Sequence, residues 1–204
     1  MMRALAFATD KHAGQTWTLP GGALVPYIKH PIGVAKLIAD AGVTDAEVLA
    51  GALLHDTVED TATTFEEIRD VFGEKVEMYV REVTDDGTLR KDAKKMEQIE
   101  RVSKASDGGK LIKIADKIFN LSDLQQKDGC VWDTPYVIGY FVWCKRVIDV
   151  ASGVNAALDA RAAEVLAGTF FEKGTGKELP CIPPGADLEV ELEKYYALCR
   201  GETA

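Results

Sequence analysis

Four ionisable side chains follow an apolar run in the stretch ALLHDTVEDT, residues 52–61. His55 and Asp56 are adjacent, and Glu59 and Asp60 follow three and four positions after the aspartate. Residues three and four apart share a face of a helix, so the imidazole and the carboxylates could converge at one helix end. Burying unpaired charge is costly, so something should compensate these groups. The pattern indicates either an exposed helix end or a cation site.

Imidazole and carboxylate together form a ligand set suited to Mn²⁺, Fe or Zn²⁺. The chain has only three histidines, so further ligands are few. His30 stands in PYIKHP, and Asp116 is expected to face inward on the apolar helix KLIKIADKIFNL. With His55 and Asp56 they would leave positions of an octahedral metal open to water and substrate. The alternative is a chance His-Asp pair together with a solvated polar stripe on a helix.

Residues typical of helix starts and helix ends recur along the rest of the chain, and they predict an all-α fold. Helix boundaries are indicated by Pro31 after an N-cap at His30 and by two capping-box spacings, Thr44 with Glu47 and Thr64 with Glu67. The apolar spacing of three and four residues predicts one long helix over about 134–168. The other helices are expected at these segments: residues 3–13, the helix that carries His55, FEEIRDVF, EKVEMYVREVT, residues 90–105 and KLIKIADKIFNLSDL.

Length and composition fit a single domain with a sizeable core, since the chain has 204 residues and 47% hydrophobic residues. Residues 1–170 are interpreted as that domain, and residues 171–204 as an extension that ends in a short amphipathic helix. The formal net charge of −9 argues against a nucleic-acid partner, which would need a basic surface, but it allows a small anionic ligand. The sequence is compatible with a homo-oligomer.

No feature of the sequence indicates a membrane or secreted protein. The apolar runs fall short of the roughly 18 residues that cross a bilayer. The start, MMRALAFATDKHAG, lacks the cleavage signature of a signal peptide. The cysteines are scattered with no C-x-x-C pair, which favours a reduced, cytoplasmic compartment.

The ordered set of His30, His55-Asp56 and Asp116 resembles the HD superfamily of metal-dependent phosphohydrolases. The segments PYIKHPIGVAKLI, ALLHDTVEDT, FGEKVEMYVREVTDD and KLIKIADKIFNLSDL resemble the hydrolase domain of the Rel/Spo alarmone enzymes. The single-domain length and YFVWCKRVI are most similar to the small alarmone hydrolases, the group that includes the metazoan SpoT homologue. This resemblance covers roughly residues 3–168 and leaves the tail after about residue 171 unmatched.

The resemblance implies an HD-domain helical bundle that uses Mn²⁺ to remove the 3′-pyrophosphate from ppGpp-like nucleotides. It assigns the metal to His30, His55, Asp56 and Asp116. It assigns the activation and orientation of the attacking water to the pair Glu59 and Asp60. It also implies three substrate contacts, at Asn120, Lys11 and Tyr140.

The phosphates of such a substrate would need cations. The stretch LRKDAKKMEQIERVSK supplies basic side chains, and Lys91 is the candidate chosen from it. Acidic residues are interleaved, so the alternative is a solvated helix. The 34 residues of tail cannot hold a nucleotide transferase, and a hydrolase without synthetase activity is therefore expected.

The base-binding region departs from the family pattern. After GQ the family usually carries a basic pair whose arginine stacks on guanine, and this chain has Trp17 and Thr18 there. Ser122 also stands where an arginine is common. An indole can stack on a purine but brings no charge. This favours an altered purine preference, with (p)ppApp open beside (p)ppGpp; the alternative is that Trp17 only packs the loop.

Two other functions remain open at this point. One is an HD-type nucleotide phosphatase acting on another phosphate ester such as NADPH, which some relatives accept. The other is a non-catalytic nucleotide sensor, which is disfavoured because a sensor has no need of the full ligand set and Glu59.

Overall fold

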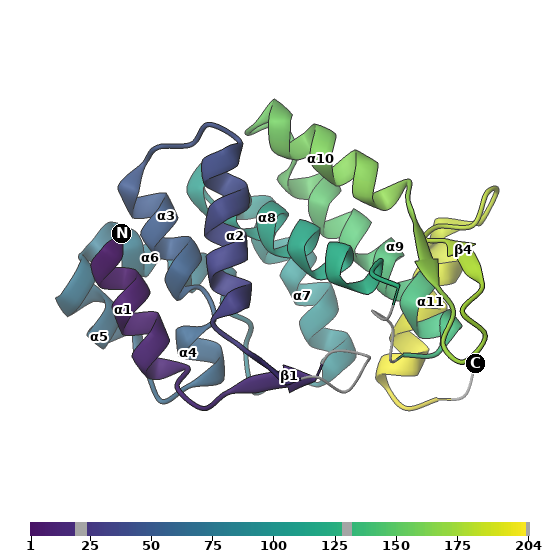
Figure 1. Ribbon diagram of the computed structural model, residues 1–204, viewed down its shortest axis with the longest axis horizontal. Helices are drawn as coiled ribbons and strands as arrows, with labels where there is room; N and C mark the ends of the chain where they lie inside the picture. The colour runs from purple at the N-terminus through teal and green to yellow at the C-terminus, as the bar shows by residue number, and fades with distance from the viewer. Residues whose placement is uncertain (19–23, 128–131, 203–204) are drawn as a thin grey trace.

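The computed structural model describes residues 1–18, 24–127 and 132–202, which form a bundle of helices with two small hairpins (Figure 1). The helices are α1 (Met2–Lys11), α2 (Lys29–Asp40), α3 (Ala46–Leu54), α4 (Thr57–Asp60), α5 (Phe65–Phe72), α6 (Glu74–Val83), α7 (Lys91–Lys104), α8 (Asp107–Leu124), α9 (Thr134–Ala151), α10 (Ala156–Leu166) and α11 (Leu188–Cys199). The strands are β1 (Thr16–Thr18), β2 (Leu24–Pro26), β3 (Thr169–Phe171) and β4 (Glu178–Pro180). Each hairpin is antiparallel, β1 with β2 and β3 with β4. The all-α prediction is confirmed, since these strands span three residues each.

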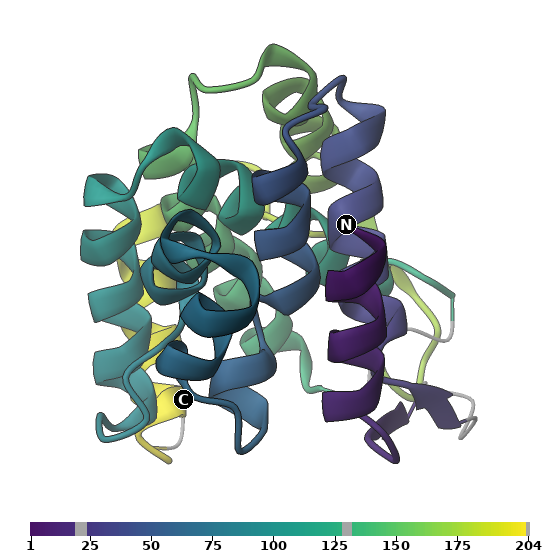
Figure 2. The same cartoon turned by 90° about the vertical axis from the view of Figure 1, so that its left-hand side faces the viewer.

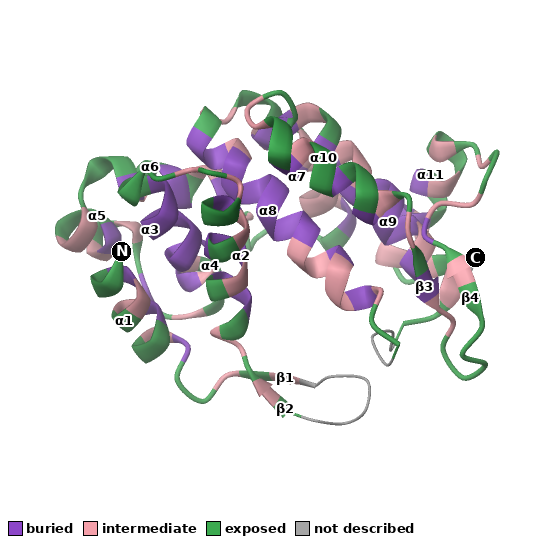
Figure 3. Cartoon of the chain, turned by 45° about the horizontal axis from the view of Figure 1, so that its top comes forward, coloured by how far each residue is buried: buried purple, intermediate pink, exposed green. Residues whose placement is uncertain are grey.

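The core is organised around α3 and α8. Every residue of α3 from Val48 to Leu54 is buried, and so is every residue of α8 from Leu111 to Ile118 (Figure 3). Helices α2, α6, α9 and α10 pack around α8, and α1 lies along the outer side of α3 (Figure 2). Because α8 is buried from residue 111 to 118, the polar residues of that segment, Lys113, Asp116 and Lys117, face either the core or a cavity. In the described part of the chain, no helix is long and apolar enough to cross a membrane.

Two predicted helix starts are wrong by one or two residues. Helix α2 begins at Lys29 with Ile28 as N-cap, so His30 lies inside the helix. The chain already turns there, because the His30 amide donates to the carbonyl of Tyr27 at 2.9 Å. Helix α3 is capped by Asp45, not Thr44: the aspartate Oδ1 accepts from the Glu47 amide at 2.8 Å and takes the role of the N-cap.

The helix start predicted at Thr64 is confirmed by α5. Thr64 Oγ1 accepts a hydrogen bond from the Glu67 amide at 3.2 Å. Helix α5 ends at Gly73, whose φ of +93° is readily adopted only by glycine. The three-residue spacing of Thr64 and Glu67 therefore located a real helix start.

Two predicted helices are interrupted. The helix expected to carry His55 through Asp60 stops at Leu54, and a separate short helix, α4, begins at Thr57. The long helix expected over 134–168 divides into α9 and α10. Gly153 adopts a φ of +98° between them, and Asn155 then caps α10 by accepting from the amides of residues 157 and 158 at 3.0 Å each. The cap at Asn155 therefore starts a new helix, although the apolar spacing continues through residues 134–168.

The C-terminal segment continues from α10 into the β3–β4 hairpin and then into α11, which packs against α9 and α7. Close approach of α11 depends on Gly139, because a Cβ there would lie 2.6 Å from the Cβ of Tyr195. Tyr195 is fully buried, and Arg200 reaches the buried carboxylate of Asp92 at 3.6 Å. The division of the chain at residue 170 stays a prediction.

Candidate metal centre

Three short elements bring the candidate ligands together. His30 lies in the first turn of α2, His55 is the C-cap of α3, and Asp56 is the N-cap of α4. The break between α3 and α4 turns His55 and Asp56 toward α2, which a continuous helix would not do. Both histidines are almost completely buried.

The ligand atoms of these residues face one another. His30 Nε2 lies 3.2 Å from His55 Nε2, and both nitrogens lie close to Asp56 Oδ2, at 3.3 Å and 3.0 Å respectively. One ligand atom from each residue lies within 4.8 Å of the others. Two ring nitrogens and a carboxylate oxygen converging in a buried space form a donor set that can hold a divalent metal ion.

Neighbouring groups fix the orientation of the ligands. His55 Nδ1 donates to the carbonyl of Ala52 at 2.8 Å, which leaves Nε2 to face the cluster. The Tyr27 hydroxyl donates to Asp56 Oδ2 at 2.6 Å. Hydrogen bonds of this kind set the tautomer and direction of metal-binding side chains. The donor set therefore fits a metal in both its chemistry and its supports.

Asp116 faces the same space from α8. Its Oδ1 lies 3.4 Å from His30 Nε2, although it is not one of the three residues whose ligand atoms converge. Lys117 Nζ lies 3.0 Å from Asp116 Oδ2, and Asn120 Nδ2 donates to Asp116 Oδ1 at 2.7 Å. The expected inward direction of Asp116 is present in the structure, and its role as a ligand stays a prediction.

Electrostatic coupling shifts the pKa values of the cluster. Burial alone would lower the pKa of His30, but hydrogen bonds to Asp116 and Asp56 outweigh it and raise the pKa to about 9. Burial would raise the pKa of Asp56, yet His55 and His30 hold it well below its usual range. The pKa of Asp116 is likewise held low, against burial, by Lys117 and Lys113. Both carboxylates are therefore ionised, as metal ligands must be.

His30 and Asp56 of the cluster, together with Asp116, line a cavity of about 250 Å³. Glu59 and Asp60, both from α4, line the same cavity. Glu59 Oε2 accepts from the backbone amide of Asp85 at 2.9 Å, which fixes its carboxylate beside the cavity. Burial and the charge of Asp85 raise the pKa of Glu59, and burial and Asp56 raise that of Asp60. A raised pKa suits a carboxylate that must exchange a proton near neutral pH.

Three lysines line this cavity, and only Lys95 belongs to the basic stretch that was expected to supply cations for phosphate. They are Lys95 from α7 and Lys113 and Lys117 from α8. Lys113 and Lys117 are only 4% exposed, so the polar stripe of α8 is not the solvated face that was the alternative. Burial and the charge of Lys117 lower the pKa of Lys95 to about 8. The signal available in the sequence was the spacing of Lys113 and Lys117 around Asp116 on one helix.

Aromatic and amide side chains complete the walls of the cavity at the metal cluster. Trp17, Asn120 and Tyr140, all predicted to contact substrate, line the cavity. The Trp17 ring lies 5.9 Å from the His30 ring and 6.2 Å from the Phe119 ring. The indole thus packs against side chains of α2 and α8 and also lines the cavity, so packing and substrate contact are compatible for Trp17.

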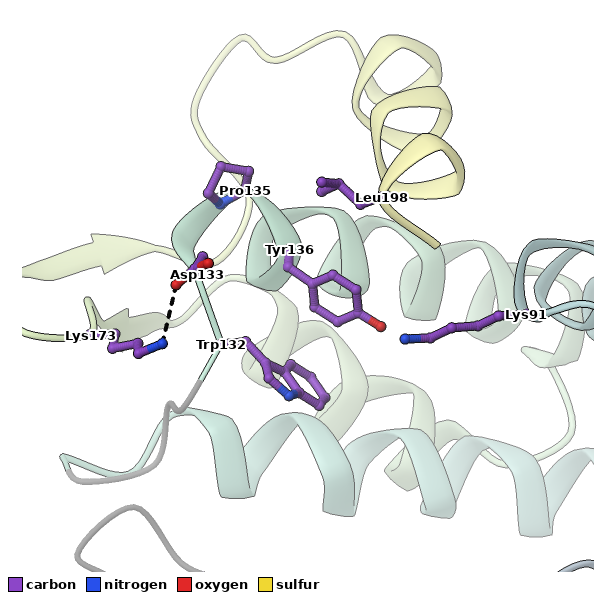
Figure 4. A pocket seen from close by; sticks show the side chains of 7 residues that line it. All are labelled: Lys91, Trp132, Asp133, Pro135, Tyr136, Lys173 and Leu198. Carbon is purple, nitrogen blue, oxygen red and sulfur yellow. Dashed lines mark hydrogen bonds and ion pairs between the residues drawn. The ribbon is translucent and has the colours of Figure 1, made fainter. Parts of the chain in front are cut away.

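Two other predicted substrate contacts lie outside this cavity. Lys11 forms an ion pair with Glu67 at 2.7 Å. Lys91 lines a different pocket, together with Trp132 and Tyr136 (Figure 4). Their roles stay predictions.

Comparisons with known proteins identify the family of the chain. Residues 4–134 match the HD domain family. The chain is 43% identical over 175 residues to the guanosine-3′,5′-bis(diphosphate) 3′-pyrophosphohydrolase MESH1 of Danio rerio, covering 85% of this chain and 94% of that protein. Identity to the human MESH1 protein is also 43%, with the same coverage.

More distant and structural relatives point the same way. A guanosine-3′,5′-bis(diphosphate) 3′-pyrophosphohydrolase of Aquifex aeolicus is 38% identical over 127 residues, or 61% of this chain and 18% of that longer protein. A solved structure described as a metazoan ortholog of SpoT that hydrolyzes ppGpp superposes with a TM-score of 0.76 at 43% identity. The match covers 81% of this chain and 92% of that structure.

Proposed function

Because the chain belongs to the HD-domain family of MESH1-type guanosine-3′,5′-bis(diphosphate) 3′-pyrophosphohydrolases, we propose that it removes the 3′-pyrophosphate from a purine alarmone. The substrate is (p)ppGpp or (p)ppApp. The observation that carries this proposal is one cavity lined by His30 and Asp56 of the His-His-Asp donor set and by three lysines, of which Lys113 and Lys117 are buried. A metal donor set beside concentrated positive charge suits a polyphosphate ester.

The proposed cofactor is Mn²⁺, held by His30, His55, Asp56 and Asp116. Nitrogen and carboxylate donors are compatible with Mn²⁺, and the short contact of Asp116 with His30 puts its carboxylate within reach of the site. When bound, the ion would polarise the attacked phosphate and lower the pKa of a bound water.

The proposed proton acceptor is Glu59. Its carboxylate is fixed by the Asp85 amide and lies in the cavity without belonging to the converging ligand set. Asp60, the next residue, is proposed to orient the same water. Water attacks the phosphorus joined to the ribose 3′-oxygen, a new phosphorus–oxygen bond forms, and the bond to the 3′-oxygen breaks. The 3′-oxygen takes up a proton, and the products are pyrophosphate and GDP, GTP, ADP or ATP.

Lys95, Lys113 and Lys117 are proposed to hold the 3′-pyrophosphate. Ammonium groups form charge-assisted hydrogen bonds with phosphate oxygens, and preorganised cations stabilise the charge that develops during transfer. Asn120 and Tyr140, which line the same cavity, are proposed to contact the ribose and its phosphates. Trp17 is proposed to stack on the purine, which supports an adenine alarmone as strongly as a guanine alarmone because stacking tolerates either base.

The enzyme is proposed to act on this small molecule in a reduced, cytoplasmic compartment. The described cysteines Cys144, Cys181 and Cys199 are free thiols, which is consistent with that setting. Cys130, the fourth cysteine, lies outside the described residues.

The test is product analysis with purified protein stripped of metal and supplied with Mn²⁺. We expect pyrophosphate from ppGpp or ppApp and no release after addition of EDTA. Glu59→Gln should lose most of this activity, while the matched control Glu74→Gln, at an exposed position on α6, should keep it. Phosphate release from NADPH alone would replace the proposal with the nucleotide phosphatase. Retained nucleotide binding with no turnover would indicate a sensor.

A further inference from the structure

A second pocket adjoins the catalytic cavity. It measures about 540 Å³ and lies between α7, the start of α9 and the C-terminal segment (Figure 4). Its lining includes Lys91, Trp132, Tyr136, Lys173 and Leu198. We call it the outer pocket.

The catalytic cavity is too small for a whole alarmone. Pockets that enclose small ligands usually measure about 300–1,000 Å³, and the cavity at the metal cluster measures about 250 Å³. A purine nucleoside with four or five phosphate groups must therefore extend beyond it. The question is which neighbouring surface receives the remainder.

Contacts between aromatic rings link the linings of the two pockets. The Trp132 ring lies 5.3 Å from the ring of Tyr140, which lines the catalytic cavity, and 5.0 Å from the ring of Tyr136, which lines the outer pocket. Tyr136 and Tyr140 are four residues apart on α9, so their side chains lie one helical turn apart on one face. A ligand that passes Tyr140 therefore meets Tyr136 next.

Lysines repeat with the same spacing on α7. Lys95 Nζ lies 5.9 Å from the centre of the Tyr140 ring, and Lys91 Nζ lies 4.9 Å from that of Tyr136. The lysine–tyrosine pair of the catalytic cavity is thus repeated one turn further out, about 5.4 Å along each helix. Figure 4 shows the Lys91 amine directed at the Tyr136 hydroxyl. Lys91 is exposed and its amine donates a hydrogen bond to the Tyr136 hydroxyl, so its charge is available to an anion.

The C-terminal segment supplies the far wall. Lys173 follows β3, and Leu198 lies in the last turn of α11 (Figure 4). Both lie beyond the residues 4–134 that match the HD domain. The wall is held in place by Tyr195, whose ring lies 5.2 Å from that of Tyr136. The Lys173 amine is 3.2 Å from Asp133, an exposed ion pair that costs little to exchange for a phosphate.

We propose that the outer pocket is a second subsite of the substrate cavity, in which Lys91 and Lys173 bind the 5′-phosphate chain while the 3′-pyrophosphate lies at the metal cluster. This inference rests on the proposed function. It gives residues 171–204 a role, since they complete a subsite that the HD domain lacks by itself.

The test is a series of nucleoside 3′-diphosphates that differ only at the 5′ position, which carries a hydroxyl, one, two or three phosphates. In the wild-type protein, kcat/KM should rise with the number of 5′-phosphates. Lys91→Ala should lower kcat/KM about tenfold for the 5′-diphosphate, the effect of one lost charge-assisted hydrogen bond, and less than twofold for the 5′-hydroxyl compound. Lys173→Ala should act in the same direction, and the control Lys177→Ala, on the same exposed hairpin, should change neither value.

A binding measurement separates this inference from the proposed function. Calorimetric titration with GDP or ADP requires no turnover, and Lys91→Ala should weaken that binding about tenfold. Equal loss on all substrates, or unchanged nucleotide binding in both lysine variants, would overturn the subsite even if the enzyme is an alarmone hydrolase. An enzyme that turns over no alarmone but whose nucleotide binding depends on Lys91 would retain the subsite and lose the proposed reaction.

Discussion

The catalytic cavity and the outer pocket use the same pair of residue types in different surroundings. At Lys95 and Tyr140 the tyrosine is buried and the lysine is partly buried, and burial together with Lys117 lowers the pKa of Lys95 to about 8. At Lys91 and Tyr136, one turn away, the lysine is exposed, and its hydrogen bond to Tyr136 raises its pKa. Buried charge acts strongly because solvent does not screen it, whereas exposed charge contributes affinity that salt weakens.

This contrast leads us to propose that the catalytic cavity carries out the reaction and that the outer pocket recognises the length of the 5′-phosphate chain. Changes at the metal cluster and at Glu59 should therefore lower the turnover of every substrate by large factors. Changes in the outer pocket should be modest and should depend on the 5′ end. Substitutions at Asp56 and Glu59 test the first half of this statement.

The largest effect is expected from Asp56→Ala. It removes the carboxylate that both histidine nitrogens contact, so metal binding and turnover should be lost together. We expect a loss of about 10⁴-fold in kcat, with Mn²⁺ content measured by elemental analysis on the same sample. The control is Asp10→Ala, at an exposed position of α1. A variant that keeps both its metal and its rate would remove Asp56 from the centre.

Glu59→Gln should have the next largest effect. It keeps the shape of the side chain but cannot accept a proton, so kcat should fall about 10²–10⁴-fold while Mn²⁺ stays bound. The separation of metal content from rate distinguishes Glu59 from Asp56. Equal loss of metal in both variants would make Glu59 a ligand instead of a base.

Lys95 should give the reaction a pH dependence. Its pKa of about 8 in the free protein means that the side chain is charged below pH 8 and neutral above it. Phosphate binding should therefore weaken as pH rises through 8, and kcat/KM, which reports the free enzyme, should fall. Lys95→Arg stays charged throughout, so its decline should move to higher pH. Identical profiles for the two proteins between pH 6.5 and 9 would count against a role for Lys95.

The smallest of these effects is expected at Trp17. Replacing it by alanine removes a stacking surface worth about 1–3 kcal/mol per base, so KM should rise about tenfold with kcat little changed. The ratio of rates on ppApp and ppGpp, measured at equal concentration, shows whether the indole favours adenine. A KM unchanged on both substrates would leave Trp17 only its packing against His30 and Phe119.

Much of the site could be expected from sequence because its residues lie in short, ordered motifs. The all-α fold followed from caps and glycine stops, and the adjacency of His55 and Asp56 is present in the chain itself. The prediction that one helix carries His55 and Asp56 together with Glu59 and Asp60 was wrong, since α3 ends at Leu54 and α4 begins at Thr57. The ligand atoms meet because the chain bends there, and a bend of that kind has no periodic signature.

The lysines show where sequence reasoning stops. Lys113 and Lys117 carry the pattern of a solvated stripe, and only the packing of α2, α6, α9 and α10 around α8 turns that stripe into a buried wall. Helical periodicity identifies the residues that share a face, but burial depends on whatever packs against that face.

The sequence by itself therefore determined the helical class, the candidate donor residues and the short spacings that carry them. The tertiary structure decided which of the charged residues share a cavity with those donors, and it placed Lys95 inside and Lys91 one turn outside. It also brought residues from the ends of α9 and α11 together into the outer pocket. The physical reason is that local spacing fixes which side chains share a face of one helix, whereas a site is defined by distances between elements far apart in the chain.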